Sequence, residues 1–187
     1  MHDASLEAHE HTEHAEHAAH AKDPFISQVS ITIAVLAVVA AITGSLETFE
    51  SGGAIIAANE AVLAQDKATD EWNFFQAKSL KKNMYVIAGD AGGPKADTYK
   101  AKAKEEGKGQ DEAQDEAKKL EHERETALAV SARHEHRHHR LSIAATLLEM
   151  GIAISTIAII TRKRWPWVAS GVLGLAGAAV ALVAYLT

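Results

Sequence analysis

The sequence predicts an all-α fold with three transmembrane helices and a water-exposed antiparallel helical hairpin of coiled-coil type between the first and second spans. Two observations lead to this prediction. Three stretches of the chain are almost purely apolar, and the charged residues crowd into the segment 47–140 between the first two stretches. That segment is also rich in Ala, Glu, Gln and Lys, which favour helices.

The three apolar stretches are residues 25–46, 141–161 and 165–187. Each has about twenty residues or more, enough for a helix to cross a hydrocarbon core of roughly 30 Å. The first and third contain no charged residue, and the second contains only Glu149. A helix in a soluble core would carry a polar face, which these stretches lack, so we interpret them as spans. The first does not resemble a signal peptide, because the leader before it is acidic and rich in His.

Composition excludes some functions and sets the domain boundaries. The absence of cysteine excludes disulfides and thiolate metal sites, and the net charge of -6 argues against nucleic acid as a partner. The predicted parts are a His/Glu-rich tail at 1–23, a first span at 24–46, a hairpin at 47–140, a second span at 141–161, and a basic turn with the third span at 162–187.

From position 11 to position 20, the tail carries a histidine at every third position. These residues are His11, His14, His17 and His20. Neighbouring imidazoles could chelate zinc, nickel or copper. On a helix, however, this spacing drifts by about 60° per step, so the four residues do not share one face. The pattern therefore favours an acidic tail that titrates near pH 6.5 without a dedicated metal, and a metal or pH sensor remains the alternative.

Glycines and one proline punctuate the segment that follows. Asp23–Pro24 is typical of a helix start, with Asp as the cap and Pro at the first helical position. We expect Gly52–Gly53 to bend or break the first helix, and the sequence GDAGGP at 89–94 to form a turn. We also expect Gly107 and Gly109 to interrupt the returning arm, so that a long helix starts at Gln110 and continues into the second span.

The predicted hairpin has a thin core built mainly of alanine. Residues at helical spacing on the outgoing arm are Ala57, Ala61, Ala64, Ala68, Trp72 and Phe75, and on the returning arm they are Ala113, Ala117, Leu120, Ala127 and Leu141, with Arg124 and His134 in the same register. Alanine stripes allow close antiparallel packing but bury little apolar area. We therefore expect neighbouring copies or another protein to complete this core.

A second histidine cluster, RHEHRHHR at 133–140, precedes the second span. The first span separates it from the tail, so the two clusters face opposite compartments and cannot form one site. His134 and His138 have the i,i+4 spacing that lets two imidazoles share a metal, but the interleaved arginines oppose a cation. We interpret the cluster as a belt that contacts lipid headgroups, together with Arg133, Arg137 and Arg140.

The spans carry one ionisable residue and stripes of small residues. Charge inside a bilayer is costly, so Glu149 should face protein or water. It would then form an interhelical hydrogen bond that fixes registry or, alternatively, line the pore of a small oligomeric channel. Small residues suited to close helix packing are Ala37 and Ala41 in the first span, Gly151 and Ser155 in the second, and Ser170, Gly174 and Ala178 in the third.

Basic and aromatic residues predict the orientation. Arg162, Lys163 and Arg164 stand in the short loop before the third span, and Trp165 and Trp167 fit an aromatic belt beside it. The positive-inside rule then predicts a cytoplasmic turn and N-terminus, with the hairpin and C-terminus outside. The arginines at 133–140 point the other way, but long external segments often escape the rule.

The chain resembles the bacterial membrane proteins of the domain-of-unknown-function family 4337. The most specific piece is DEWNFFQAKSLK at 70–81, within the longer stretch 59–85, and the His- and Glu-rich leader and the TRKRWPW loop contribute to the resemblance. The resemblance covers nearly the whole chain. It implies the three-span layout and a bacterial origin, and it implies no catalytic residue or ligand. The expected location is the bacterial inner membrane.

Together these features predict a non-catalytic structural or accessory membrane protein that self-assembles or belongs to a larger membrane complex. The sequence has no phosphate-binding glycine loop after a strand, no GxSxG motif and no serine beside a base, so an enzyme is not expected. We expect no cofactor, apart from the metals that the tail could bind. The expected partners are the lipid bilayer and further protein chains.

Overall fold

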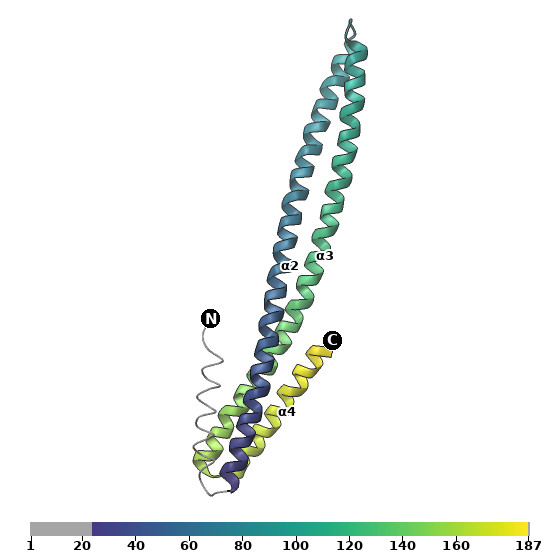
Figure 1. Cartoon of the computed structure of the whole chain (residues 1–187). Coiled ribbons are helices and arrows are strands. Elements are labelled where there is room, and N and C mark those ends of the chain that lie inside the picture. The colour runs from purple at the N-terminus through teal and green to yellow at the C-terminus, as the bar shows by residue number, and fades with distance from the viewer. Residues whose placement is uncertain (1–23, 187) are drawn as a thin grey trace. The chain divides into compact units, whose positions relative to one another are not determined.

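A computed structural model describes residues 24–186. It contains three helices, which are α2 (Pro24–Asp90), α3 (Ala96–Thr161) and α4 (Arg164–Leu186) (Figure 1). No strand occurs among these residues, which confirms the all-α class. Each helix contains a window long and apolar enough to cross a membrane. At most 39% of any such window is buried inside the chain, so most of its residues keep part of their surface exposed, as is expected of helices that face lipid.

The two long helices pass through the glycines that were expected to interrupt them. Helix α2 begins at Pro24, as predicted, and continues through Gly52 and Gly53, and α3 continues through Gly107 and Gly109. The predicted break and interruption are therefore wrong. A helical glycine costs about 1 kcal/mol relative to alanine. Long flanking runs of good helix formers and packing along the helix offset so small a local cost.

The predicted turn at 89–94 joins α2 to α3. Gly92 and Gly93 adopt φ angles of 78° and 98°, which only glycine reaches without strain. The amide of Ala91 donates to the carbonyl of Ile87 at 3.1 Å, and the amide of Ala96 donates to that of Gly93 at the same distance. These bonds satisfy backbone groups left free at the helix ends.

The chain divides into two compact units, one formed by residues 24–54 with 133–186 and the other by residues 55–132. In the second unit the predicted alanine stripes are buried, including Ala61 at 2% exposure and Ala117 at 0%. Trp72 Nε1 donates to Glu121 Oε1 at 2.9 Å, and Lys82 Nζ donates to Gln110 Oε1 at 3.3 Å. From the first bond to the second, the residue number rises on α2 and falls on α3, so the two segments run antiparallel within this unit.

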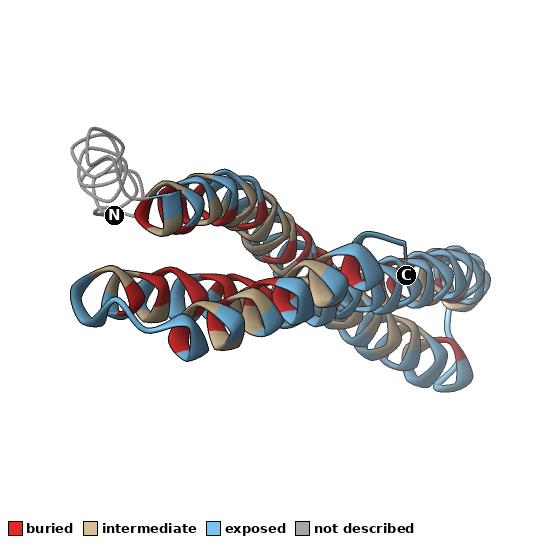
Figure 2. Ribbon diagram, turned by 90° about the horizontal axis from the view of Figure 1, so that it is seen from below, coloured by how far each residue is buried: buried red, intermediate tan, exposed pale blue. Residues whose placement is uncertain are grey.

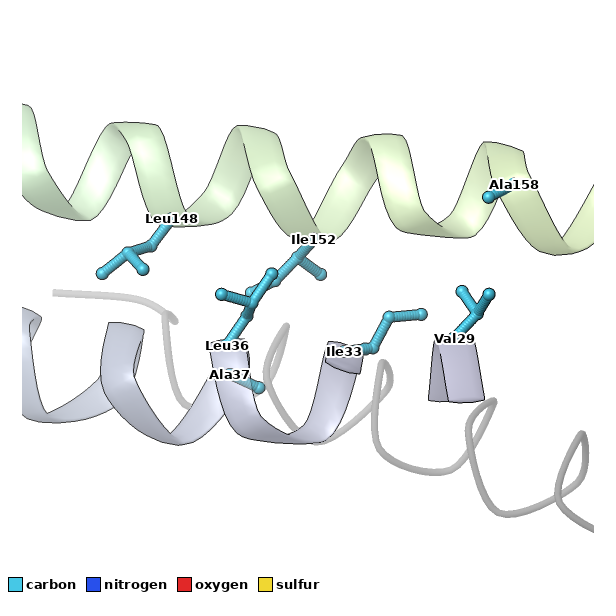
Figure 3. Close-up of a cluster of buried hydrophobic side chains, with 7 residues drawn as sticks. All are labelled: Val29, Ile33, Leu36, Ala37, Leu148, Ile152 and Ala158. Atoms are coloured by element: carbon cyan, nitrogen blue, oxygen red, sulfur yellow. The ribbon is translucent and has the colours of Figure 1, made fainter. Parts of the chain in front are cut away.

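The first unit holds the main apolar core. Val29, Ile33, Leu36 and Ala37 of α2 pack with Leu148, Ile152 and Ala158 of α3 (Figure 3). Buried residues recur at intervals along each helix and leave much of its surface exposed (Figure 2). This pattern places one stripe of each helix in the core, as helical periodicity requires.

Candidate functional site

The three candidate spans meet at a junction of small residues in the first unit. Ser155 of α3 and Ser170 of α4 are fully buried, and their hydroxyls are hydrogen-bonded to each other. Gly151 lies beside this pair, where an added Cβ would be 3.2 Å from the carbonyl oxygen of Ser170 and 3.5 Å from the amide nitrogen of Gly174. The backbones of α3 and α4 therefore approach each other closely, which small residues permit.

Leu36 of α2 fills the notch that two glycines leave at this junction. A Cβ added at Gly174 would overlap Cδ2 of Leu36, and one added at Gly151 would lie 3.4 Å from Cδ1 of the same residue. We name Leu36, Gly151, Ser155, Ser170 and Gly174 the three-helix junction. Four of these residues were predicted as packing positions, and the structure brings them together within one chain.

The other three residues predicted for close helix packing differ in burial. Ala37 is buried in the core, but Ala41 is exposed and Ala178 is half-buried. The residue in contact next to Ala178 is Gly177, where a Cβ would lie 2.9 Å from both the carbonyl oxygen of Ala144 and Cγ of Leu148. The sequence analysis missed Gly177 because it continued the stripe four residues after Gly174 instead of three. The signal available was that Gly177, not Ala178, is the smaller residue.

Glu149 lies on an exposed face of α3. Its neighbour Leu148 is fully buried in the core, whereas Glu149 itself is exposed. One helical turn away on either side, Thr146 and Ala153 are also exposed, and the next polar position along this face, Thr156, is half-buried. A single chain therefore carries a carboxyl group and small or hydroxyl side chains on the outer surface of its second candidate span. The expectation that this carboxyl faces protein or water stays a prediction.

A cluster of acidic and basic side chains lies in the first unit, between the ends of two segments that are far apart in sequence. Nδ1 of His134 lies 2.6 Å from Oε2 of Glu50, and Nη1 of Arg137 lies 3.7 Å from the other oxygen of that carboxylate. Glu47, one turn before Glu50, has a carboxylate oxygen 3.8 Å from Nδ1 of His138. We name these five residues the acid–base cluster.

Gly53 makes room for this cluster. An added Cβ would lie 2.9 Å from both Cε1 and Nδ1 of His134, so the imidazole occupies the space next to the glycine. His136 and His139 are exposed, and the prediction that they contact lipid headgroups remains a prediction. Within residues 24–186, no group of three or more His, Asp or Glu side chains could hold a metal ion.

The basic turn between α3 and α4 is exposed. Arg162, Lys163, Arg164 and Trp165 are accessible on its surface. Trp167 is half-buried instead, because its indole Nε1 donates to Thr32 Oγ1 of α2 at 3.0 Å. Its ring also meets Phe25 edge-on, with centroids 6.1 Å apart. Trp167 thus anchors α4 to the start of α2, while the other four residues are free to contact headgroups and water.

The histidines of the tail, His11, His14, His17 and His20, lie outside the described residues.

Comparison with known proteins gives one positive finding. The family described as Domain of unknown function (DUF4337) matches residues 25–187. No curated protein and no solved structure matches the chain. Because the match extends from the first candidate span to the last residue, the chain belongs to the DUF4337 family.

Proposed function

We propose that this protein is a non-catalytic structural or accessory protein of a bacterial inner membrane, either self-assembled or a subunit of a larger membrane complex. Its three apolar segments span the bilayer, and residues 47–140 form a helical hairpin in water. The N-terminus and the basic turn lie in the cytoplasm. The outward-facing apolar surfaces of the three helices support the membrane location.

The exposed position of Glu149 carries the proposal. A carboxylate that faced lipid near the middle of a helix would cost about 2.5–3.5 kcal/mol on insertion scales, so such residues normally face other helices or water. The face around Glu149 also presents Thr146 and Ala153, which suit close contact with another helix. Further protein contacts, from another copy or from a partner, would remove this face from lipid.

Two variants at Glu149 test the proposal. Glu149→Gln keeps the shape and most of the hydrogen-bonding capacity, so the native particle extracted in mild detergent should keep a mass above one chain. Glu149→Leu should weaken the assembly, because interhelical hydrogen bonds in membranes contribute roughly 0.5–2 kcal/mol. The mass of the native particle, measured for each variant, tests both expectations. A wild-type particle that is a monomer and binds no other protein would contradict the proposal.

The same exposed face favours a second candidate, a small oligomeric channel with Glu149 in its pore. Thr146 and Thr156 would add hydroxyl groups to such a lining. Cation or proton flux into liposomes would then fall with Glu149→Gln while the particle mass stays unchanged. If the protein is instead structural or accessory, the wild type should give no cation or proton flux. Measurable flux that the Gln variant abolishes would replace the scaffold with the channel.

A further inference from the structure

The basic turn between α3 and α4 carries three positive side chains without a negative partner. Arg162, Lys163 and Arg164 are exposed, and none of them forms an ion pair within residues 24–186. The first turn of α4 contains no acidic residue. Glu149, on the same helix α3, stands twelve residues before Thr161, which is about 18 Å along the helix axis. The described part of the chain therefore leaves the three charges of this turn unneutralised.

A single acidic segment of the chain shares a compartment with the basic turn. In a three-span chain, the residues before the first span and those between the second and third spans lie on the same side, whichever way the chain is oriented. Residues 24–46 and 165–187 contain no charged side chain. The carboxylates of residues 47–140 lie on the opposite side of the membrane. The acidic side chains of this chain that can meet the turn are therefore those of the tail, residues 1–23.

The charge of the tail is complementary to that of the turn. The tail contains six carboxylates and one lysine, so its net charge is -5 when its histidines are neutral. Three of the carboxylates, Glu10, Glu13 and Glu16, alternate with histidines. The negative charge of the tail exceeds the positive charge of the turn. An anionic lipid surface would consequently be repelled by the tail wherever the tail lies beside the turn.

The first described residues of α2 lie beside the basic turn. The rings of Phe25 and Trp167 meet edge-on with centroids 6.1 Å apart, and Trp167 Nε1 donates to Thr32 Oγ1 at 3.0 Å. Arg164 precedes Trp167 by three residues, which is less than one turn of α4. The tail is thus joined to the chain next to the turn. A segment tethered so close to its target has an effective concentration on the order of millimolar, at which weak ion pairs suffice for binding.

We propose that the acidic tail, residues 1–23, binds the basic turn of the same chain through ion pairs between its carboxylates and Arg162, Lys163 and Arg164, and that protonation of the tail's histidines releases it. This inference rests on the proposed function, because the three-span layout places the tail and the turn on one side of the membrane. It gives the tail a target, and it makes the turn accessible to other anions under acidic conditions alone.

The histidines of the tail determine the direction of the pH dependence. They number six, and each protonated imidazole adds one positive charge, so the net charge of the tail rises from -5 to at most +1 as the pH falls through about 6.5. The three basic side chains of the turn stay charged over this range. Residues 24–32 at the start of α2 and 165–173 at the start of α4 contain no titratable side chain. The attraction is therefore present at neutral pH and is lost in mild acid.

Distances between two spin labels, measured by electron paramagnetic resonance, test this contact in the full chain. The chain contains no cysteine, so Ala15→Cys together with Trp165→Cys labels one position in the tail and one beside the turn. Trp165 is 70% exposed and uncharged, so its replacement removes no charge from the turn. An excess of unlabelled wild type in phosphatidylcholine bilayers restricts the signal to distances within one chain. A population of short distances should be present at about pH 8 and lost at about pH 5.5.

Two matched variants test the role of the carboxylates. Both change the tail and leave the basic turn intact, because basic residues determine the orientation whereas acidic residues contribute little to it. Replacing Glu10, Glu13 and Glu16 together by Gln should reduce the short-distance population at least about threefold, since three exposed ion pairs are lost. Replacing the same residues by Asp keeps their charges and should retain that population. Equal populations in the two variants would refute the proposed ion pairs.

The type of lipid distinguishes the tail from headgroups as the occupant of the turn. In bilayers rich in phosphatidylglycerol, the short-distance population should persist at about pH 8, because the tethered tail competes well with lipid. If that population occurs in phosphatidylcholine and disappears in phosphatidylglycerol, headgroups occupy the turn and the proposal fails. The proposal also fails if no short distance occurs in phosphatidylcholine at either pH.

Labelling from one side of the membrane separates this inference from the proposed function. A maleimide that does not cross membranes should label the single variants Ala15→Cys and Trp165→Cys from the same side of intact vesicles. If it does so and the short distances are absent, only this inference fails. If the two cysteines are labelled from opposite sides, the three-span layout of the proposed function fails as well. Circular dichroism of each variant checks that it keeps the helical content of the wild type.

Discussion

At the scale of single residues, the space beside each glycine determines how the spans pack. Two glycines of α4 illustrate this. Gly177 has the carbonyl oxygen of Ala144 and the side chain of Leu148 within 2.9 Å of the position of a Cβ, whereas Gly171 has nothing within 4 Å. Gly177 therefore permits a close contact between helices, whereas Gly171 takes part in no such contact within the described residues.

We expect opposite effects when these glycines are replaced by alanine. Both substitutions gain up to about 1 kcal/mol of helix propensity. Gly177→Ala also forces a methyl group against backbone, and overpacking of this kind costs typically about 1–3 kcal/mol. Gly177→Ala should thus lower the thermal unfolding temperature in detergent relative to Gly171→Ala. Equal midpoints for the two variants would contradict the close approach of α3 and α4.

At the scale of helices, sequence patterns predicted the elements better than their interruptions. The alanine stripes and the start at Pro24 follow from helical periodicity and capping, which are local properties. The effect of Gly52, Gly53, Gly107 and Gly109 was predicted wrongly. The free-energy cost of a helical glycine is local, whereas the packing that offsets it extends along a 67-residue and a 66-residue helix. The pairing of Glu50 with His134 could not be predicted either, since it depends on the register between segments 84 residues apart.

The neighbouring glycines of α2 provide a test of this interpretation. Gly52 has nothing within 4 Å of an added Cβ, so Gly52→Ala should stabilise the helix by about 0.5–1 kcal/mol. Gly53→Ala would place its methyl group against the imidazole of His134 and displace that ring from Glu50, at an overpacking cost of about 1–3 kcal/mol. Thermal unfolding of both variants in detergent should show opposite shifts. A rise in unfolding temperature for both would mean that the imidazole does not occupy that space.

At the scale of the whole molecule, the distribution of basic residues predicts the orientation. The exposed basic turn at 162–164 predicts a cytoplasmic location. The second basic run, at 133–140, points the other way in the sequence, but His134, Arg137 and His138 of that run lie beside Glu47 and Glu50. This run ends a long segment, and long external segments often escape the positive-inside rule, so the turn should dominate the topology.

Reporter fusions read the orientation directly. A reporter that is active only outside the cytoplasm should be active when fused after Thr187 and when inserted at Gly92, because both positions follow an odd number of spans from a cytoplasmic N-terminus. The same reporter inserted at Lys163 should be inactive. Cytoplasmic location of both Gly92 and Thr187 would reverse the orientation and leave the three-span layout intact.

The hydrogen bond between Ser155 and Ser170 has a consequence for biogenesis. Each hydroxyl satisfies the other, so α3 and α4, which are joined by a short turn, can enter lipid as a pair without an unsatisfied polar group at that contact. Helix α2 leaves the ribosome before either of them, and its Leu36 has no notch to occupy until Gly151 and Gly174 arrive. We therefore expect maturation in the membrane to end with the docking of the first-made helix onto a pair formed after it.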